Sequence, residues 1–186
     1  MCSTTIQHDR DQLLNLIKTD AYFREKIILS SGKESDYYID ARRVTLNPQG
    51  AHLCARLILD IAKDEKIDAI GGPTLGADPM IGAIGVLSLQ DGRPINTFII
   101  RKAPKAHGKQ QQIEGPLLKE GSTVVLIDDV ATTGKAFIQS LDVLEKENIK
   151  VAKAICIVDR DEGAQEALAK RGCDLVSIFD IKEIHN

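Results

Sequence analysis

Short apolar runs alternate with longer amphipathic stretches along this chain of 186 residues. Several of these runs are continuous, short and rich in Val and Ile, which is typical of strands buried on both faces of a parallel sheet. They occupy residues 67–70, 95–100, 124–128, 151–158 and 175–181. Between them, apolar residues recur at helical spacing over residues 77–89, 137–147 and 164–170. Strands that alternate with helices predict an α/β fold, with a mostly parallel, twisted sheet flanked by helices.

The first part of the chain has a different pattern. Residues Asp11 to Phe23 carry apolar side chains at helical spacing and predict an amphipathic helix. Residues 26–40 predict two short strands around the turn at Ser31-Gly32. Asn47 suits a helix cap and Pro48 a first helical position, so a helix is expected from there to about Asp64.

Length and composition limit the class of protein. The chain can bury one sizeable core, so we expect a single domain, with residues 1 to about 45 as a small hood over a core of residues 46–186. A formal net charge of -3 argues against a general nucleic-acid binder. No apolar stretch approaches the roughly 20 residues that span a bilayer, and the first ten residues lack the pattern of a signal peptide. We therefore expect neither nucleic-acid nor membrane binding.

The cysteines indicate the cellular compartment. Cys2, Cys54, Cys156 and Cys173 are far apart and form no Cys-x-x-Cys pair, so neither a zinc site nor a dithiol redox motif is indicated. Cys54 and Cys156 lie within apolar patterns and are expected to be buried thiols. This usage predicts a reducing, cytoplasmic location.

The candidate chemistry begins where the apolar run Val124–Ile127 ends in two adjacent carboxylates, Asp128 and Asp129. A small, hydroxyl-rich turn follows at residues 131–134, and then a helical pattern begins. Ligands of open α/β sheets bind where a strand's carboxyl end meets a helix N-terminus, and free N–H groups there favour a phosphate. The two acids suit ribose hydroxyls or a divalent cation instead. The motif therefore predicts a phosphorylated sugar. An ordinary strand-to-helix corner would need only one capping residue.

Cations gather in a second segment, residues 101–115, where Pro104 and Gly108 predict a loop. No acid occurs in it before Glu114, and its basic residues are Arg101, Lys102, Lys105 and Lys109, which His107 can join. A solvated loop without function is the alternative, but a loop this long in a compact domain is commonly a lid or binding element. Preorganised cations of this kind stabilise the charge of a departing diphosphate.

Residues 124–136 resemble the signature of the type I phosphoribosyltransferases, which bind 5-phosphoribosyl 1-diphosphate (PRPP). Other segments are similar to the orotate enzymes of that family: Leu29–Asp40 to their orotate-binding motif, Arg101–Gly108 to their catalytic loop and Gly71–Ala77 to their diphosphate-contacting turn. The resemblance spans nearly the whole chain. It implies the type I fold and Mg²⁺-dependent transfer of ribose 5-phosphate from PRPP to orotate, which yields orotidine 5′-phosphate and diphosphate in pyrimidine (UMP) biosynthesis.

The resemblance also implies a role for each matching residue. The catalytic residues would be Arg101, Lys102, Lys105, His107, Asp128 and Asp129. These six would bind PRPP together with Thr74, Leu75, Val130, Ala131, Thr132, Thr133, Gly134, Lys135 and Ala136. Orotate would contact Tyr38, Ile39, Thr132 and Arg160. Mg²⁺ would be held mainly by PRPP and water, near the two acids.

Arg160 also makes sense without the resemblance. It follows the carboxyl end of a predicted strand, and its planar guanidinium suits a carboxylate such as that of orotate. The alternative is a surface pair of Asp159 with Arg160. Tyr37 and Tyr38 suit the flanks of a planar ring, although a strand tyrosine is as often part of a core.

The family further implies a homodimer whose basic loop crosses to the neighbouring active site. Lys102 would then act in the partner's site, while Arg101, Lys105 and His107 divide between the two. In one place the chain departs from the pattern: many orotate enzymes carry a lysine just before Ser-Gly, where this chain has Ser30. A cation expected near the ligand is therefore missing, and Lys33 is close in sequence only.

Two other functions remain as alternatives. One is a phosphoribosyltransferase for another base, such as a purine or uracil, against which Arg160 and the Tyr37-Tyr38 motif argue. The other is a PRPP-sensing regulator that binds nucleic acid and has lost catalysis. Such a regulator should carry an extra basic face or a helix-turn-helix segment, and the sequence shows neither pattern.

Overall fold

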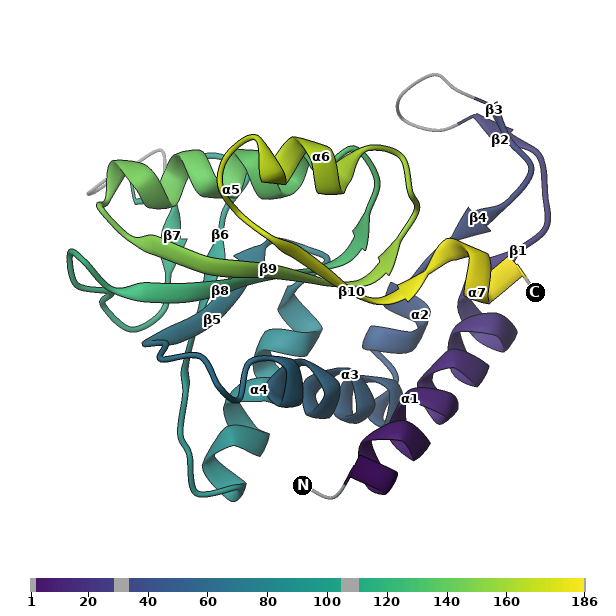
Figure 1. Ribbon diagram of the computed structural model, residues 1–186, viewed down its shortest axis with the longest axis horizontal. Helices are drawn as coiled ribbons and strands as arrows, with labels where there is room; N and C mark the ends of the chain where they lie inside the picture. The colour runs from purple at the N-terminus through teal and green to yellow at the C-terminus, as the bar shows by residue number, and fades with distance from the viewer. Residues whose placement is uncertain (1–2, 29–33, 105–110, 186) are drawn as a thin grey trace.

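A computed structural model describes residues 3–28, 34–104 and 111–185 of the protein. The fold is organised around one central sheet (Figure 1). The six strands follow the order β10-β9-β8-β5-β6-β7. All neighbouring strands are parallel except β7, which is antiparallel to β6 at one edge. The strands are β5 (Ala69–Pro73), β6 (Asn96–Ile100), β7 (Ile113–Glu114), β8 (Thr123–Ala131), β9 (Lys150–Asp159) and β10 (Leu175–Asp180). The predicted α/β class with a mostly parallel sheet is confirmed.

Helices cover both faces of this sheet (Figure 1). One face carries α1 (Ser3–Leu16), α3 (Pro48–Ile61) and α4 (Asp78–Gln90), and the other carries α5 (Lys135–Lys146) and α6 (Ala164–Ala169). Successive side chains of a strand point to opposite faces. Accordingly Val125 and Ile127 of β8 pack with the first set of helices, and Val124 and Leu126 with the second. Burial on both faces explains why this strand is apolar throughout.

The helix predicted from Asp11 to Phe23 has different bounds. It begins at Ser3, passes into a π-helix at Ile17–Ala21 and ends before Tyr22. The prediction was wrong at its end because Tyr22–Phe23 form the short strand β1, which pairs with β4 (Tyr38–Ile39). Backbone pairing with a distant segment therefore overrode the local helical spacing.

The two short strands predicted within residues 26–40 are present as β2 (Ile27–Ile28) and β3 (Glu34–Ser35), which pair antiparallel. Their turn at Ser31-Gly32 lies outside the described residues. The small antiparallel sheets formed by β1 to β4 stand beside the carboxyl edge of the main sheet, next to α7 (Ile181–His185) (Figure 1). A four-residue helix, α2 (Arg42–Thr45), leads from β4 back towards the core.

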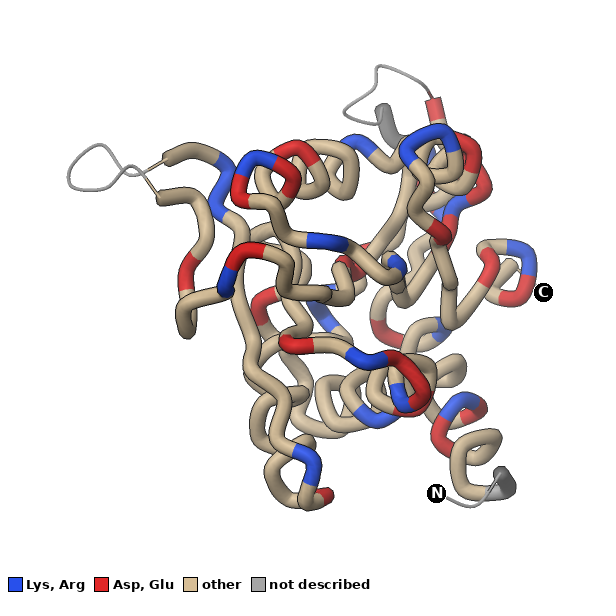
Figure 2. Tube along the Cα trace, turned by 60° about the vertical axis from the view of Figure 1, so that its left-hand side comes forward, with Lys and Arg blue, Asp and Glu red and all other residues tan. Residues whose placement is uncertain are grey.

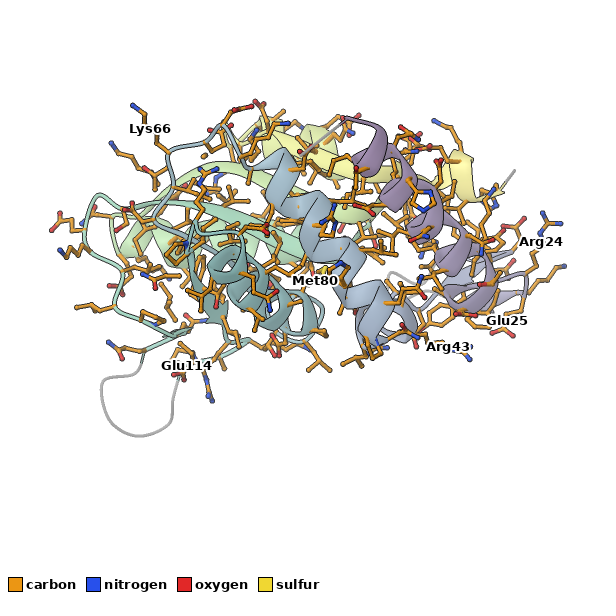
Figure 3. The ribbon with its side chains drawn as sticks, turned by 90° about the horizontal axis from the view of Figure 1, so that it is seen from below. Arg24, Glu25, Arg43, Lys66, Met80 and Glu114 are labelled. Carbon is orange, nitrogen blue, oxygen red and sulfur yellow. The ribbon has the colours of Figure 1, made fainter. Side chains whose placement is uncertain are left out.

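The predicted start of α3 is confirmed. The side chain of Asn47 accepts hydrogen bonds from the N–H groups of Gln49 and Gly50, at 2.9 and 3.2 Å, and Pro48 occupies the first turn. The predicted burial of Cys54 and Cys156 is confirmed as well. Met80 of α4 is fully buried, and Figure 3 shows it in the interior, while Lys66 and Arg24 project outward at the periphery.

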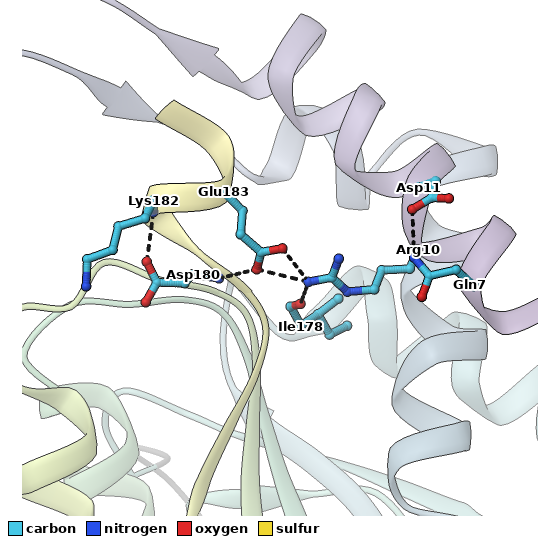
Figure 4. Close-up of polar contacts among 7 residues, drawn as sticks. All are labelled: Gln7, Arg10, Asp11, Ile178, Asp180, Lys182 and Glu183. Carbon is cyan, nitrogen blue, oxygen red and sulfur yellow. Dashed lines mark hydrogen bonds and ion pairs between the residues drawn. The ribbon is translucent and has the colours of Figure 1, made fainter. Parts of the chain in front are cut away.

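The helix α7 was not predicted from the sequence. An ion pair connects it to α1 (Figure 4). The guanidinium of Arg10 donates to both carboxylate oxygens of Glu183, at 2.9 and 2.7 Å, and to the carbonyl of Ile178 at 3.0 Å. It also lies over the ring of Phe179. These contacts join the first helix to the last one.

Over the described residues, charges of both signs are spread along the chain. Figure 2 shows basic and acidic positions interspersed along the described part of the chain. Among the described residues, none of the helices is long and apolar enough to cross a membrane.

Candidate active site

The candidate site lies at the carboxyl edge of the sheet, where β8 ends at Ala131 and α5 begins at Lys135. Gly134 between them has a φ of 75°, a conformation that glycine adopts without steric cost. A Cβ at this position would also stand only 2.8 Å from Cδ1 of Leu168 on α6. The first N–H groups of an α-helix have no partner within the helix, so this turn offers donors to an anion.

A cleft of about 600 Å³ opens at this turn. It is lined by Lys102, Asp128, residues 130–137, Gln139 and Arg160. An adjoining cleft of about 340 Å³ shares six of these residues and adds residues 38–42, residues 73–76 and Asp129. The two clefts therefore form one continuous site, with the turn before α5 at one end and the segment around Tyr38 at the other.

The two acids of the motif are held by the backbone. Oδ1 of Asp128 accepts the N–H of Asp129 at 3.0 Å, and Oδ1 of Asp129 accepts the N–H of Val130 at 2.8 Å. Asp128 is only 7% exposed. Burial, with the neighbouring charge of Asp129, raises the pKa of Asp128 well above its ordinary value. Burial also raises the pKa of Asp129, against the opposing effects of the Val130 N–H and the charge of Arg42.

The turn after β5 passes directly over both acids. A Cβ at Gly76 would stand 2.3 Å from Oδ1 of Asp128 and 2.6 Å from Oδ1 of Asp129. The same turn includes a cis peptide bond between Thr74 and Leu75, and the Thr74 hydroxyl donates to Asp78 at 2.8 Å. Any larger residue at position 76 would collide with the acids, so glycine is required for this close approach.

Arg160 is 8% exposed and lines both clefts. Its Nε donates to the Tyr37 hydroxyl at 3.1 Å and lies 3.0 Å from Oε1 of Glu162. Its Nη2 donates to the Ser35 hydroxyl at 3.4 Å, and its guanidinium lies over the Tyr37 ring, 4.7 Å from the centroid. Because Asp159 and Arg160 are both buried, the alternative of a surface pair is wrong.

Most of the residues predicted for the site come together in space. The clefts are lined by Lys102, Thr74, Leu75, Asp128, Asp129, Val130, Ala131, Thr132, Thr133, Gly134, Lys135, Ala136, Tyr38, Ile39 and Arg160. Arg101 lines a third, adjoining cleft of about 470 Å³, and its guanidinium is 3.4 Å from Glu114. Lys105 and His107, like Ser30 and Lys33, lie outside the described residues.

Some residues of the site were not predicted. Arg42 lines the cleft beside Asp129, and its Nε donates to Asp40 at 3.0 Å. Its place, two residues after the Tyr-Ile-Asp segment, was the only signal in the sequence. Ser35 and Glu162 belong to the site because they contact Arg160. No local sequence pattern predicts these contacts.

The acids fit a metal ion that is held mainly by a substrate. Among the described residues, no group of three or more His, Cys, Asp or Glu side chains is arranged to hold a metal. Asp128 and Asp129 offer carboxylate oxygens, which Mg²⁺ prefers, but they do not complete a coordination shell. Phosphate oxygens and water would supply the remaining ligands.

A turn with free N–H donors, paired acids and a nearby lysine at the carboxyl edge of this mostly parallel sheet are the arrangement expected of a type I phosphoribosyltransferase. The phosphoribosyl transferase domain family matches residues 40–186. An orotate phosphoribosyltransferase of Aquifex aeolicus is 39% identical over 179 residues, which cover 95% of this chain and 97% of that protein. The chain belongs to the orotate phosphoribosyltransferase family.

Solved structures agree with this assignment. The orotate phosphoribosyltransferase of Mycobacterium tuberculosis H37Rv in complex with Fe(III) dicitrate superposes with a TM-score of 0.83 at 35% identity, covering 95% of this chain and 98% of that one. The same enzyme in complex with PRPP superposes with a TM-score of 0.80 at 31% identity, covering 96% and 99%. The predicted type I fold is confirmed.

Proposed function

We propose that this enzyme transfers ribose 5-phosphate from PRPP to N1 of orotate in pyrimidine biosynthesis, giving orotidine 5′-phosphate and diphosphate. One observation carries the proposal. A single cleft joins a phosphate-binding turn and two buried acids to a buried arginine, which matches a ligand pair of phosphorylated ribose and carboxylated base.

The sugar end of the cleft binds PRPP through the backbone and two carboxylates. The N–H groups at the start of α5, with the hydroxyls of Thr132 and Thr133, receive the 5-phosphate. Asp128 and Asp129 accept hydrogen bonds from the ribose hydroxyls, and these bonds favour the ionised carboxylates that burial disfavours. With PRPP bound in this way, its anomeric carbon would face the other end of the cleft.

The base end holds the carboxylate of orotate on Arg160. N1 of orotate is the nucleophile, so the reaction needs no nucleophilic side chain. The bond from the anomeric carbon to N1 forms as the bond to the diphosphate oxygen breaks. Positioning of the two substrates and compensation of charge then account for catalysis.

Lys102 lines the cleft where the diphosphate would leave, and Arg101 lines the adjoining one. Their charges stabilise the departing diphosphate, as would the predicted residues Lys105 and His107 of the same loop. Mg²⁺, when bound near Asp128 and Asp129, neutralises further diphosphate charge.

The activity is tested by mixing the purified protein with PRPP, Mg²⁺ and orotate and following the ultraviolet absorbance of orotate. We expect a loss of absorbance that requires both PRPP and Mg²⁺. A panel with uracil, adenine, guanine and hypoxanthine should show no comparable turnover, because these bases carry no carboxylate for Arg160. Folded protein that leaves orotate unchanged would reject the function, and faster turnover of another base would reassign it.

We further infer a homodimer in which Lys102 serves the neighbouring site. Support comes from the family resemblance and from the exposed position of Lys102 near the start of the basic loop. If sites are shared, mixing inactive Lys102→Ala with inactive Asp128→Asn should restore about a quarter of the wild-type activity, because half of the dimers are mixed and each has one intact site. No recovery after subunit exchange would place Lys102 in its own subunit's site.

A further inference from the structure

The contacts that hold Arg160 continue outward to the last helix. The ring of His185 on α7 lies edge-on to the ring of Tyr37, with centroids 4.6 Å apart and an interplanar angle of 84°. It is also edge-on to Tyr22, with centroids 5.4 Å apart. The Tyr22 hydroxyl is 2.7 Å from Nδ1 of His185, a hydrogen-bonding distance. Tyr37, in turn, contacts Arg160 with both its hydroxyl and its ring.

We propose that Tyr37 and His185 are positioning residues for Arg160, so that binding of the carboxylated base depends on helix α7. The inference rests on the proposed function, in which Arg160 receives the carboxylate of orotate. It adds residues that do not line the described clefts and that act on the substrate through a chain of side-chain contacts.

Arg160 needs such support because a guanidinium binds a carboxylate well only in one orientation. Tyr37 and Glu162 both engage Nε, and Ser35 engages Nη2. A guanidinium has five N–H donors. These contacts use the N–H of Nε and one N–H of Nη2, and the remaining N–H groups are left for a ligand in the cleft. The acceptor of Tyr37 and the carboxylate of Glu162 thereby determine the plane of the group.

Tyr37 needs support in turn because the backbone around it is weakly paired. It lies between two strands of only two residues each, β3 and β4, which belong to separate small sheets. Strands this short contribute little stability on their own. The position of the Tyr37 ring therefore depends on its side-chain neighbours, which include His185, Tyr22 and Arg160.

Helix α7 is held by polar contacts that do not use the side chain of His185. Glu183 binds Arg10 of α1, and Oε1 of Glu183 accepts the N–H of Asp180 at 3.1 Å (Figure 4). Lys182 donates to Asp161 at 2.6 Å, next to Arg160 in the chain. These contacts do not involve His185, so substitution of its side chain should leave the helix in place.

Three substitutions separate the two contacts of His185. His185→Ala removes the ring and the hydrogen bond to Tyr22. His185→Phe keeps the edge-on ring against Tyr37, and His185→Asn keeps a polar atom near the position of Nδ1. Tyr37→Phe keeps the ring under Arg160 but removes one of the two acceptors of its Nε and leaves Glu162 as the other. His8→Ala is the matched control, because His8 is an exposed histidine of α1 that bonds only locally, to Gln12.

Steady-state kinetics with both substrates, together with thermal unfolding, test the proposal. We expect His185→Ala and Tyr37→Phe to raise the KM for orotate roughly fivefold, the range expected for loss of part of a charged hydrogen-bond network. The KM for PRPP and the unfolding temperature should stay close to wild type. His185→Phe should recover most of the orotate affinity if the ring contact dominates, and His185→Asn should recover it if the hydrogen bond does.

Two results would overturn the proposal: an unchanged KM for orotate in both His185→Ala and Tyr37→Phe, or an equal rise in both KM values with a lower unfolding temperature. The second result would show a structural role only. Failure of the proposed function looks different, because then the wild-type protein itself does not consume orotate.

Discussion

The two ends of the cleft are built in different ways. At the sugar end, nine consecutive residues from Asp128 to Ala136 provide the acids, the turn and the start of α5, and the backbone holds the acids. At the base end, Arg160 is held by Tyr37, which lies 123 positions away, and by Ser35 and Glu162. The sugar end depends on local backbone geometry, whereas the base end depends on side chains brought together by tertiary packing. Remote substitutions should therefore affect the base end first.

The largest effect is expected between the two ends, at Lys102. Lys102→Ala should lower kcat by about 10²- to 10³-fold, because a preorganised charge on the leaving diphosphate is lost. PRPP binding, measured by calorimetry, should be partly kept, since the phosphate turn and the acids remain. Lys119→Ala removes an exposed lysine elsewhere and serves as the control. Unchanged turnover in Lys102→Ala would show that Lys102 has no catalytic role and would contradict the role proposed for the basic loop.

The base end is tested by Arg160→Gln. The KM for orotate should rise roughly 100-fold, because two charge-assisted hydrogen bonds to the carboxylate are lost. The affinity for PRPP should stay within about twofold, since the sugar end is built separately. Arg171→Gln, which removes an arginine from surface ion pairs, is the matched control. Equal losses of affinity for both substrates would show that the two ends are not independent.

The sugar end is tested by Gly76→Ala. The new Cβ would collide with Oδ1 of Asp128 and of Asp129, so the acids or the turn must shift. We expect the KM for PRPP to rise about tenfold, with a smaller effect on orotate. Gly82→Ala is the control, because a Cβ there meets nothing within 4 Å. It should stabilise helix α4 by about 0.5–1 kcal/mol without changing either KM.

The smallest expected effect is on the free energy of unfolding. In the variant Asp128→Asn, stability and activity should change in opposite directions. Burial raises the pKa of this carboxyl in the folded chain, so the native state favours the protonated form. Its stabilising contribution is therefore present at low pH and is lost as the pH rises from about 4 through the raised pKa. Asp128→Asn cannot ionise and should be more stable than wild type by roughly 1–2 kcal/mol at pH 8, but not at pH 4.

Thermal unfolding of wild type and Asp128→Asn between pH 4 and pH 8 measures the difference in stability. The activity of Asp128→Asn should fall, because the ribose hydroxyls lose a carboxylate acceptor. A variant that is less stable than wild type at pH 8 would contradict the assigned direction of the pKa shift.

The sequence alone determined the succession of the long strands and helices along the chain. It also determined the turn that follows Asp128 and Asp129 at the end of β8. Each depends on residues that are close together in the chain, such as the apolar run before Asp128 or the cap Asn47 before Pro48. Periodicity and capping report local backbone structure, and a contiguous motif carries its own geometry. The short elements β1, β4, β7, α2 and α7 escaped prediction because each has too few residues to establish a period.

Only the tertiary structure decided what surrounds Arg160 and what lies over the acids. The sequence placed Arg160 at the end of a strand, but its contacts with Tyr37, Glu162 and Ser35 follow from the packing of the small antiparallel strands beside the main sheet. Likewise, Gly76 meets Asp128 because β5 and β8 are neighbours in the sheet. Contacts between side chains far apart in the chain leave no periodic trace in sequence, because they arise only when the crossovers bring the strand ends to one edge.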